Sequence, residues 1–290
     1  MKKINKVIIC GLGALGLTYS AKLINNCELK ILANQERIEK YLKNPPVFNE
    51  KIMDLEYINP SMKENADLII ISTKSLGLDL AIEYIKNFVS ENTIIISLIN
   101  GISSEEKILE KYPNAKVLRS YFIGHSAIRE NNIVQQDGIG KIVFEPNSSL
   151  ENFFRESNID YEISKDIIYS LWIKLGVNIV LNQLSAIYKC NVGELKRNQN
   201  FIYYRDNLLE EIEAVAKAYG IKNLENYKKE VINAIDLIAD DGKTSMYQDI
   251  LAKRQTEVDI FSGEIIKLGK KYNIETPYNL EIYNTILENV

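Results

Sequence analysis

The sequence predicts an α/β protein: a doubly wound parallel sheet with edge hairpins comes first, and an all-helical C-terminal domain follows. In the first half, short and nearly continuous apolar runs alternate with helical patterns, as in a parallel sheet buried on both faces. The segment 125–145 alternates polar and apolar residues between turn sequences, which indicates antiparallel hairpins added to the sheet's edge. Strand signals stop after residue 163, so the predicted domains are 1–164 and 165–290.

The individual elements follow from the periodicity of apolar residues along the chain. The runs that predict strands in the first domain are 6–10, 29–33, 67–72, 93–98, 116–118 and 161–163, with helices at 15–25 and 78–88. In the second domain the spacing is helical throughout. The predicted helices there are 165–188, 203–219, 223–239, 245–272 in one or two pieces, and a last helix after Pro277.

Composition excludes several classes of protein. The 290 residues are 46% apolar and 26% charged, close to the average for globular proteins and unlike a disordered or fibrous chain. A net charge of -4 argues against a general nucleic-acid binder, which needs excess positive charge. Three scattered cysteines do not make a disulfide framework, and a single histidine excludes a multi-histidine metal site.

The N-terminus allows two interpretations. Its lysines followed by the apolar run 7–17 resemble a signal peptide. Three glycines at fixed spacing inside that run, and a second apolar strand at the distance of a β-α-β unit, favour a strand and helix instead. No other stretch approaches the roughly 18 uninterrupted apolar residues of a membrane helix. We therefore expect a cytoplasmic protein, a monomer or homodimer, with a small-molecule substrate and neither nucleic acid nor membrane as partner.

The first motif that carries chemistry is a glycine-rich turn after the first strand. Its residues are Gly11, Leu12, Gly13, Ala14, Leu15 and Gly16, a GxGxxG that opens the first helix. Gly11 allows the tight turn, Gly13 lets the backbone approach a pyrophosphate, and Gly16 permits close packing of helix on strand. The phosphates would bind at the helix N-terminus. This context favours a Rossmann-type dinucleotide-binding domain over a glycine turn without a ligand.

The end of the second strand bears on the choice between NADP and NAD. NAD-binding folds usually place an acid about 20 residues past the glycine motif, where it binds the ribose. Here no acid stands at the immediate strand end, and Asn34 with Arg37 can contact a 2′-phosphate. Glu36 keeps NAD open, and Arg37 is also explained as a solvated cation at a helix start. We favour NADP as the cofactor.

Two further strand ends carry polar residues. The third strand runs into Lys74 and the fourth into Asn100, which precedes Gly101. In an open α/β sheet ligands bind outside the carboxyl ends of the strands, so both side chains are candidates for binding. The structural alternative is an exposed lysine and an asparagine that only begins a turn.

The stretch 171–184 is apolar nearly all round, which predicts a buried helix. Lys174, Asn178 and Asn182 recur at i, i+4 and i+8 and form one polar stripe along it. Buried amides and an ammonium without partners are costly, so the stripe must face a polar cavity or a partner network. Desolvation would lower the pKa of Lys174 and make it a general acid near neutral pH. The alternative is a salt bridge to a carboxylate on a neighbouring helix.

A second polar cluster lies at 244–263. Ser245 with Gln248, and Thr256 with Asp259, each have the spacing of a capping box. Spacing alone therefore makes Ser245 a helix N-cap and gives it no role in catalysis.

The chain resembles the ketopantoate reductase (2-dehydropantoate 2-reductase) family nearly end to end. Two motifs in this order carry the resemblance most specifically: the Trp172-x-Lys174-Leu175-x-x-Asn178-x-x-x-Asn182 helix, and Ser245-Met246-x-Gln248-Asp249 leading to Arg254-x-Thr256-Glu257-x-Asp259-x-x-x-Gly263. The glycine turn, the Lys74 turn, Leu98-Ile99-Asn100-Gly101 and Gly193-Glu194-Leu195 match as well.

The resemblance implies reduction of 2-dehydropantoate to pantoate with NADPH, in pantothenate and coenzyme A synthesis, in a cleft between the two domains. It implies that Lys174 protonates the C2 oxygen as hydride arrives at the carbon. The other implied roles are substrate binding by Asn178, Asn182 and Ser245, contact of Asn100 with substrate and cofactor, fixing of the cofactor by Lys74 and Glu257, and a place beside the nicotinamide ribose for Ala127.

Two positions depart from the family pattern. The family often has an asparagine directly before Gly-Glu-Leu, where it meets the substrate; here Val192 stands there and Asn191 one place earlier. Members with a basic residue at the end of the second strand use it for the 2′-phosphate; here Asn34 stands there. Two alternatives therefore stay open: a reductase of other branched 2-keto acids, and a non-enzymatic nucleotide sensor, against which the intact Lys174 stripe argues.

Overall fold

The computed structural model describes residues 3–124, 128–136, 138 and 140–288. The chain divides into two compact units, Met1–Ile167 and Ile168–Val290. The predicted boundary at Ser164 lies in the short segment between the last strand and the long helix that follows it.

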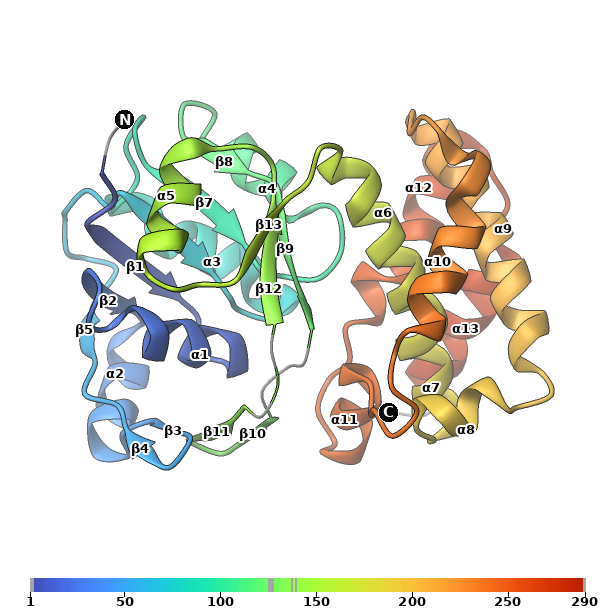
Figure 1. The fold of residues 1–290 in the computed structure, drawn as a ribbon, viewed down its shortest axis with the longest axis horizontal. Helices are drawn as coiled ribbons and strands as arrows, with labels where there is room; N and C mark the ends of the chain where they lie inside the picture. Colours follow the sequence, from blue (N-terminus) through green and yellow to red (C-terminus); the bar gives the residue numbers. More distant parts are fainter. Residues whose placement is uncertain (1–2, 125–127, 137, 139, 289–290) are drawn as a thin grey trace. The chain divides into compact units, whose positions relative to one another are not determined.

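The first unit is built on a six-stranded parallel sheet (Figure 1). Its strands are β1 (Lys6–Cys10), β2 (Glu28–Leu32), β5 (Glu56–Ile58), β6 (Leu68–Ile71), β7 (Ile94–Ser97) and β8 (Lys116–Leu118). They lie in the order β5-β2-β1-β6-β7-β8, and every neighbouring pair is parallel. The chain runs outward in both directions from β1 and β6, so the switch point at which such sheets bind ligands lies beyond the carboxyl ends of these two strands. The doubly wound sheet predicted from the sequence is confirmed.

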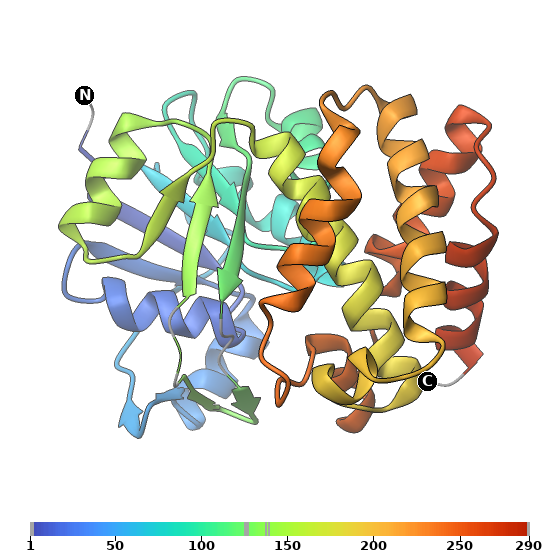
Figure 2. The same ribbon diagram turned by 45° about the vertical axis from the view of Figure 1, so that its right-hand side comes forward.

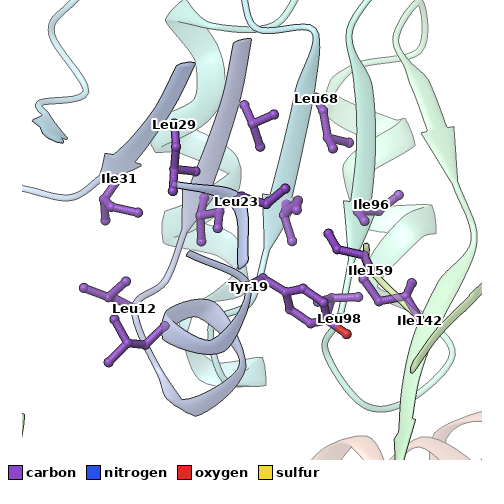
Figure 3. Packing of buried hydrophobic residues seen from close by; sticks show 14 of the residues in the cluster. Leu12, Tyr19, Leu23, Leu29, Ile31, Leu68, Ile96, Leu98, Ile142 and Ile159 are labelled. Atoms are coloured by element: carbon purple, nitrogen blue, oxygen red, sulfur yellow. The ribbon is translucent and has the colours of Figure 1, made fainter. Parts of the chain in front are cut away.

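Most helices of this unit connect these strands. They are α1 (Ala14–Leu23), α2 (Gln35–Lys43), α3 (Leu78–Tyr84), α4 (Ser104–Lys111) and α5 (Ser148–Glu156), with 3-10 turns η1 (Ser75–Gly77) and η2 (Ile85–Asn87). Figure 3 shows Tyr19 and Leu23 of α1 in one buried cluster with Leu29, Leu68 and Ile96 of the sheet, and the ring of Tyr19 lies near Leu98. This core fixes the start of α1, and with it the glycine-rich turn, against the strand ends.

The antiparallel strands expected at the sheet's edge form two small sheets of their own. In one, β9 (Ser120–Gly124) pairs with β12 (Gly140–Phe144), which β13 (Tyr161–Ile163) joins in parallel. In the other, β10 (Ile128–Glu130) and β11 (Ile133–Gln135) form a hairpin that continues into β3 (Val47–Phe48) and β4 (Lys51–Ile52). Phe122, Ile142 and Phe144 join the core cluster of the main sheet, so these strands cover a face of that sheet instead of extending its edge.

The described part of the second unit is entirely helical, as predicted. Its helices are α6 (Ile167–Val177), α7 (Leu184–Tyr188), α8 (Val192–Lys196), α9 (Phe201–Tyr219), α10 (Tyr227–Asp236), α11 (Ser245–Leu251), α12 (Ser262–Tyr272) and α13 (Pro277–Glu288). A π-helical turn, η3 (Asn178–Gln183), joins α6 to α7, and 3-10 turns η4 (Leu224–Asn226) and η5 (Val258–Ile260) precede α10 and α12. Figure 2 shows α10 (orange) alongside α9 (yellow-orange), and the two helices are in contact.

The segment Ile167–Tyr188 is one continuous helix at the centre of this unit. By length and composition it could cross a membrane, although polar residues such as Lys174 interrupt its apolar residues. Most of its apolar surface is buried by the surrounding helices. The hydroxyl of Tyr227 on α10 donates to the carbonyl of Trp172 at 2.9 Å, and a Cβ at Gly176 would lie only 2.6 Å from that hydroxyl oxygen. This close packing makes it the core helix of the second unit.

Candidate functional site

The glycine-rich turn joins β1 to α1, and its glycines have different reasons to be glycine. Gly11 has φ +103°, and a Cβ there would lie 2.6 Å from the backbone nitrogen of Thr73. A Cβ at Gly16 would lie 2.0 Å from the carbonyl oxygen of Gly11. A Cβ at Gly13 would meet only the carbonyl oxygen of Ser72, at an ordinary 3.7 Å. The described part of the chain therefore requires glycine at Gly11 and Gly16 but would accept a Cβ at Gly13 without a clash, which fits a turn whose Gly13 is kept for a ligand's approach.

The first turn of α1 is suited to an anion. Gly13 is its N-cap residue and supplies no side-chain cap, and no acidic residue lies in the first turn. The N–H groups of that turn point out of the helix, and the helix dipole favours negative charge at this end. The hydroxyl of Ser72 donates to the carbonyl of Gly11 at 2.7 Å and ties the end of β6 to the turn.

The strand ends beside this turn carry the predicted cofactor residues of the first unit. Cys10 is in register with Ile71, and Ile71 with Ser97, so Lys74 and Asn100 follow neighbouring strands at the same carboxyl edge as Gly11. Lys74 is exposed at the start of η1, and Asn100 is half-buried. Directly before Lys74, the Oγ1 of Thr73 is buried and has no hydrogen-bond partner among the described residues.

The end of β2 holds the residues that bear on cofactor choice. Asn34 is the N-cap of α2, and its Oδ1 accepts the backbone N–H of Arg37 at 3.0 Å. The side-chain oxygen of Asn34 is thus already bonded to the helix backbone, while the side chain of Arg37 is exposed in the first turn. Glu36 is exposed in the same turn. This strand end therefore exposes one positive charge, that of Arg37, and one negative charge, that of Glu36.

A second arginine, which the sequence analysis missed, lies at the same turn. Arg129 of β10 donates from Nη1 to the carbonyl of Leu12 and from Nε to the carbonyl of Asn131 at 2.9 Å. Burial lowers the pKa of Arg129, and the nearby positive charge of Arg37 lowers it further. Within the described ranges, no carboxylate forms an ion pair with either guanidinium. No local pattern could reveal this residue, because β10 reaches the turn only through the pairing of β11 with β3.

In the second unit, Asn178 and Asn182 of the predicted polar stripe are bonded to each other and to Ser245. The Nδ2 of Asn182 donates to the Oδ1 of Asn178 at 3.1 Å, and its Oδ1 accepts from the hydroxyl of Ser245 at 3.2 Å. Asn182 is 7% exposed, whereas Asn178 and Lys174 are half-buried on the preceding turns. The structure therefore brings Asn178, Asn182 and Ser245 together along one side of the central helix that also carries Lys174.

The capping predictions at 244–263 are wrong, and the error matters for Ser245. Thr244, not Ser245, is the N-cap of α11: its Oγ1 accepts the backbone N–H of Tyr247 at 3.3 Å. The hydroxyl of Ser185 lies 2.6 Å from Thr244 Oγ1, and this tertiary contact helps hold the threonine at the cap. The hydroxyl of Ser245 is consequently available to Asn182.

The second predicted capping box is also absent. The turn η5 begins after Glu257 without a side-chain cap, and Asp259 accepts the hydroxyl of Tyr283 at 2.7 Å instead of capping with Thr256. Glu257 is half-buried and belongs to the second unit, unlike the other predicted cofactor residues that the structure describes. Ala127 lies outside the described residues.

The first position that departs from the family pattern, directly before Gly193-Glu194-Leu195, is buried and carries no amide side chain. Val192 is 1% exposed, and its backbone N–H donates to the carbonyl of Gly242 at 3.0 Å. Asn191 does not replace the expected amide, because its Oδ1 caps α8 by accepting the N–H of Glu194 at 2.8 Å. The carboxylate of Glu194 completes the box on the N–H of Asn191.

Comparison with known proteins finds matches along almost the whole chain. Residues 7–149 match the family model described as ketopantoate reductase PanE/ApbA, and residues 166–289 match the one for its C-terminal part. The 2-dehydropantoate 2-reductase of Aquifex aeolicus is 29% identical, covering 94% of this chain and 93% of its own. That of Lactococcus lactis is 31% identical over 75% of this chain and 73% of its own. A structure of D-mandelate dehydrogenase with NADH and anilino(oxo)acetate is 24% identical, covers 98% of both chains and has the same fold, with a TM-score of 0.87.

Proposed function

This chain belongs to the ketopantoate reductase family, and from that premise we propose that it reduces 2-dehydropantoate to (R)-pantoate with NADPH. The observation that carries the proposal is the bonded group of Asn178, Asn182 and Ser245 on the helix of Lys174. A sealed core helix has no need of an ammonium and two amides, whereas a keto acid needs such donors for its carboxylate and its carbonyl. The proposed enzyme acts on a small molecule in the cytoplasm, in the step that supplies pantoate for pantothenate and coenzyme A.

In the second unit, Lys174 is the proposed general acid. Bound NADPH supplies the hydride. As negative charge develops on the C2 oxygen, the Nζ of Lys174 donates a proton to it, so that no free alkoxide forms. The amides of Asn178 and Asn182 and the hydroxyl of Ser245 hold the carboxylate and hydroxyl groups of the substrate, with Asn100 of the first unit as a further contact. Fixing these groups in advance lowers the entropic part of the barrier.

In the first unit, the glycine turn is the proposed pyrophosphate site. The space at Gly13 and the uncapped start of α1 suit a phosphate, and Lys74 and Asn100 stand at the neighbouring strand ends. We assign the 2′-phosphate of NADP to Arg37, with Asn34 at the same strand end and Arg129 as a second cation. Two guanidiniums that meet no described carboxylate favour a dianion over a neutral ribose hydroxyl. Glu257 and Ala127 complete the set by family resemblance.

A second candidate function is the reduction of other branched 2-keto acids on the same scaffold. It is favoured by Val192, which is buried where many relatives have a substrate-binding asparagine, and by Asn191, whose oxygen caps a helix. A pocket without that amide discriminates less against substrates that lack the hydroxyl group of ketopantoate.

Steady-state rates with purified protein test the proposal. We expect kcat/KM with NADPH to be higher for ketopantoate than for 2-ketoisocaproate, and Lys174→Ala to lower kcat by about 10²–10⁴-fold with the Kd for NADPH nearly unchanged. Lys229→Ala, an exposed lysine on α10, is the matched control. A clear preference for 2-ketoisocaproate selects the second candidate. Full turnover by Lys174→Ala would show that Lys174 is not the general acid. If the protein oxidises NADPH with no 2-keto acid, the result supports a nucleotide sensor.

A further inference from the structure

We propose that Gln183 is a positioning residue: its side chain holds the π-helical turn Asn178–Gln183 in place and so sets where Asn178 and Asn182 present their amides. The proposal rests on the proposed function only in that these amides are taken to bind a substrate. Gln183 itself touches no proposed substrate group. It is fully buried and had no place in the sequence-based site.

The side chain of Gln183 occupies a position in the helix ladder that normally belongs to the backbone. In an α-helix the N–H of residue 183 donates to the carbonyl of residue 179, four positions earlier. Here the side-chain Nε2 of Gln183 donates to that carbonyl of Ile179, at 3.2 Å. In a π-helical turn the backbone N–H of residue 183 bonds five positions back, and the side-chain amide of Gln183 donates to the carbonyl four positions back. Insertion of a side chain into the ladder is a known cause of such distortions.

A buried network holds the amide of Gln183 in that position. Its Nε2 also donates to the hydroxyl oxygen of Ser262 at 2.8 Å, and its Oε1 accepts the backbone N–H of Ser262 at 3.2 Å. The hydroxyl of Ser262 donates to Asn279 at 2.8 Å, and the Nδ2 of Asn279 donates to Glu211 at 2.8 Å. All four side chains are buried and come from the central helix and from α12, α13 and α9. A fully bonded network of this kind defines one geometry.

The turn matters for the polar stripe because of helix geometry. At 3.6 residues per turn, Lys174 and Asn182 would point in directions that differ by roughly 80°. A π-helical turn has more residues in each ring, so it rotates less per residue and brings Asn182 back toward the line of Lys174. The bonds of Asn182 to Asn178 and Ser245 are made in this arrangement. Loss of the turn would rotate Asn182 away from the line of Lys174 and break its bond to Ser245, whereas Asn178 and Asn182, four residues apart, would stay neighbours.

The test replaces Gln183 with leucine, which keeps a similar volume but removes the donor to Ile179. We expect kcat/KM for the keto acid to fall by about 10²-fold, the effect of misplacing binding groups by about 1 Å, with the Kd for NADPH within about twofold. Tyr227→Phe is the matched control, because it removes another buried bond to a carbonyl of the same helix, that of Trp172. It should lower Tm similarly while kcat/KM stays within about threefold.

The outcomes separate positioning from stability. Equal losses of kcat/KM in Gln183→Leu and Tyr227→Phe at matched Tm, or wild-type kcat/KM in a folded Gln183→Leu, would overturn the proposal. If Gln183→Leu does not fold, Gln183→Glu keeps an acceptor for Ser262 and serves in its place. A crystal structure of the variant gives a readout besides activity: the backbone bond from residue 183 to Ile179 should form and the Asn182–Ser245 bond should be lost. That readout decides the proposal even if the chain reduces no 2-keto acid.

Discussion

Gly13 and Gly16 stand three residues apart in one turn, yet substitution at each should have a different effect. A Cβ at Gly16 would lie 2.0 Å from the carbonyl oxygen of Gly11 and 2.7 Å from the hydroxyl oxygen of Ser72. Gly16→Ala should therefore lower the free energy of unfolding by about 1–3 kcal/mol or more. Gly13→Ala meets only an ordinary contact, so stability should change by less than about 1 kcal/mol, while a methyl group enters the space left for a pyrophosphate and weakens NADPH binding about tenfold or more.

Urea unfolding and NADPH titration of the two variants check this pair, and each variant is the control for the other. A Gly13→Ala protein that binds NADPH as the wild type does would show that the turn does not hold the cofactor. A loss of stability at Gly13 equal to that at Gly16 would show that the space is needed by the protein itself.

Glu105, a buried carboxyl group at the start of α4, gives the first unit a predictable pH dependence. Burial raises its pKa, although the hydroxyl of Ser104 at 2.8 Å and the N–H of Ser120 at 3.4 Å oppose this. Because the pKa is higher in the folded than in the unfolded state, its contribution to stability is full below the ordinary glutamate pKa and is lost as pH rises through the folded value. Glu105→Gln should be more stable than the wild type at pH 7.5.

That advantage should shrink toward pH 4, because the raised pKa keeps the folded carboxyl protonated there and the unfolded carboxyl becomes protonated as well. Urea unfolding at the two pH values measures it, with the exposed Glu110→Gln as the control that shows no such change. An equal difference between Glu105→Gln and the wild type at both pH values would mean that the buried carboxyl is not the titrating group.

At the scale of elements, the sequence predicts what long apolar patterns determine. The strands 6–10 and 116–118 coincide with β1 and β8, and the helix 165–188 is observed from Ile167. The strands β3 and β4 were missed because two residues are too few to show a period, and the three-residue β5 was missed as well, although the predicted β8 and β13 are no longer than it. The hairpin strands were recognised, but their position over a face of the sheet depends on Phe122 and Phe144 packing on residues distant in sequence.

In the candidate site too, features set by local sequence were predicted and features set by contacts between distant residues were not. The stripe of Lys174, Asn178 and Asn182 was visible because helical spacing places such residues on one face. The cap at Thr244 was not, because a contact with Ser185 favours it over the equally plausible Ser245. The π-helical turn was not predictable either, since it depends on Gln183 bonding to α12.

At the scale of the whole molecule, a single tryptophan makes the two units separately observable. Trp172 lies buried in the second unit, so its fluorescence reports the unfolding of that unit, whereas far-UV circular dichroism reports both. A ligand that binds only the folded state at a hundred times its Kd adds about 2.7 kcal/mol of stability. For a unit of the size of the first, Met1–Ile167, that amount raises the midpoint of thermal unfolding by about 5–11 °C.

NADPH should therefore raise the thermal transition of the first unit by this amount, and NADH at the same concentration should raise it less, because it lacks the phosphate assigned to Arg37 and Arg129. The assignment of Glu257 to the cofactor adds a second expectation: the fluorescence transition of Trp172 should also move, and Glu257→Gln should diminish that movement without abolishing the shift seen by circular dichroism. An unmoved fluorescence transition in the wild type would confine cofactor binding to the first unit. Equal shifts with NADPH and NADH would show that the two arginines do not bind the 2′-phosphate, because a phosphate bound by two guanidiniums must make NADPH bind more tightly than NADH.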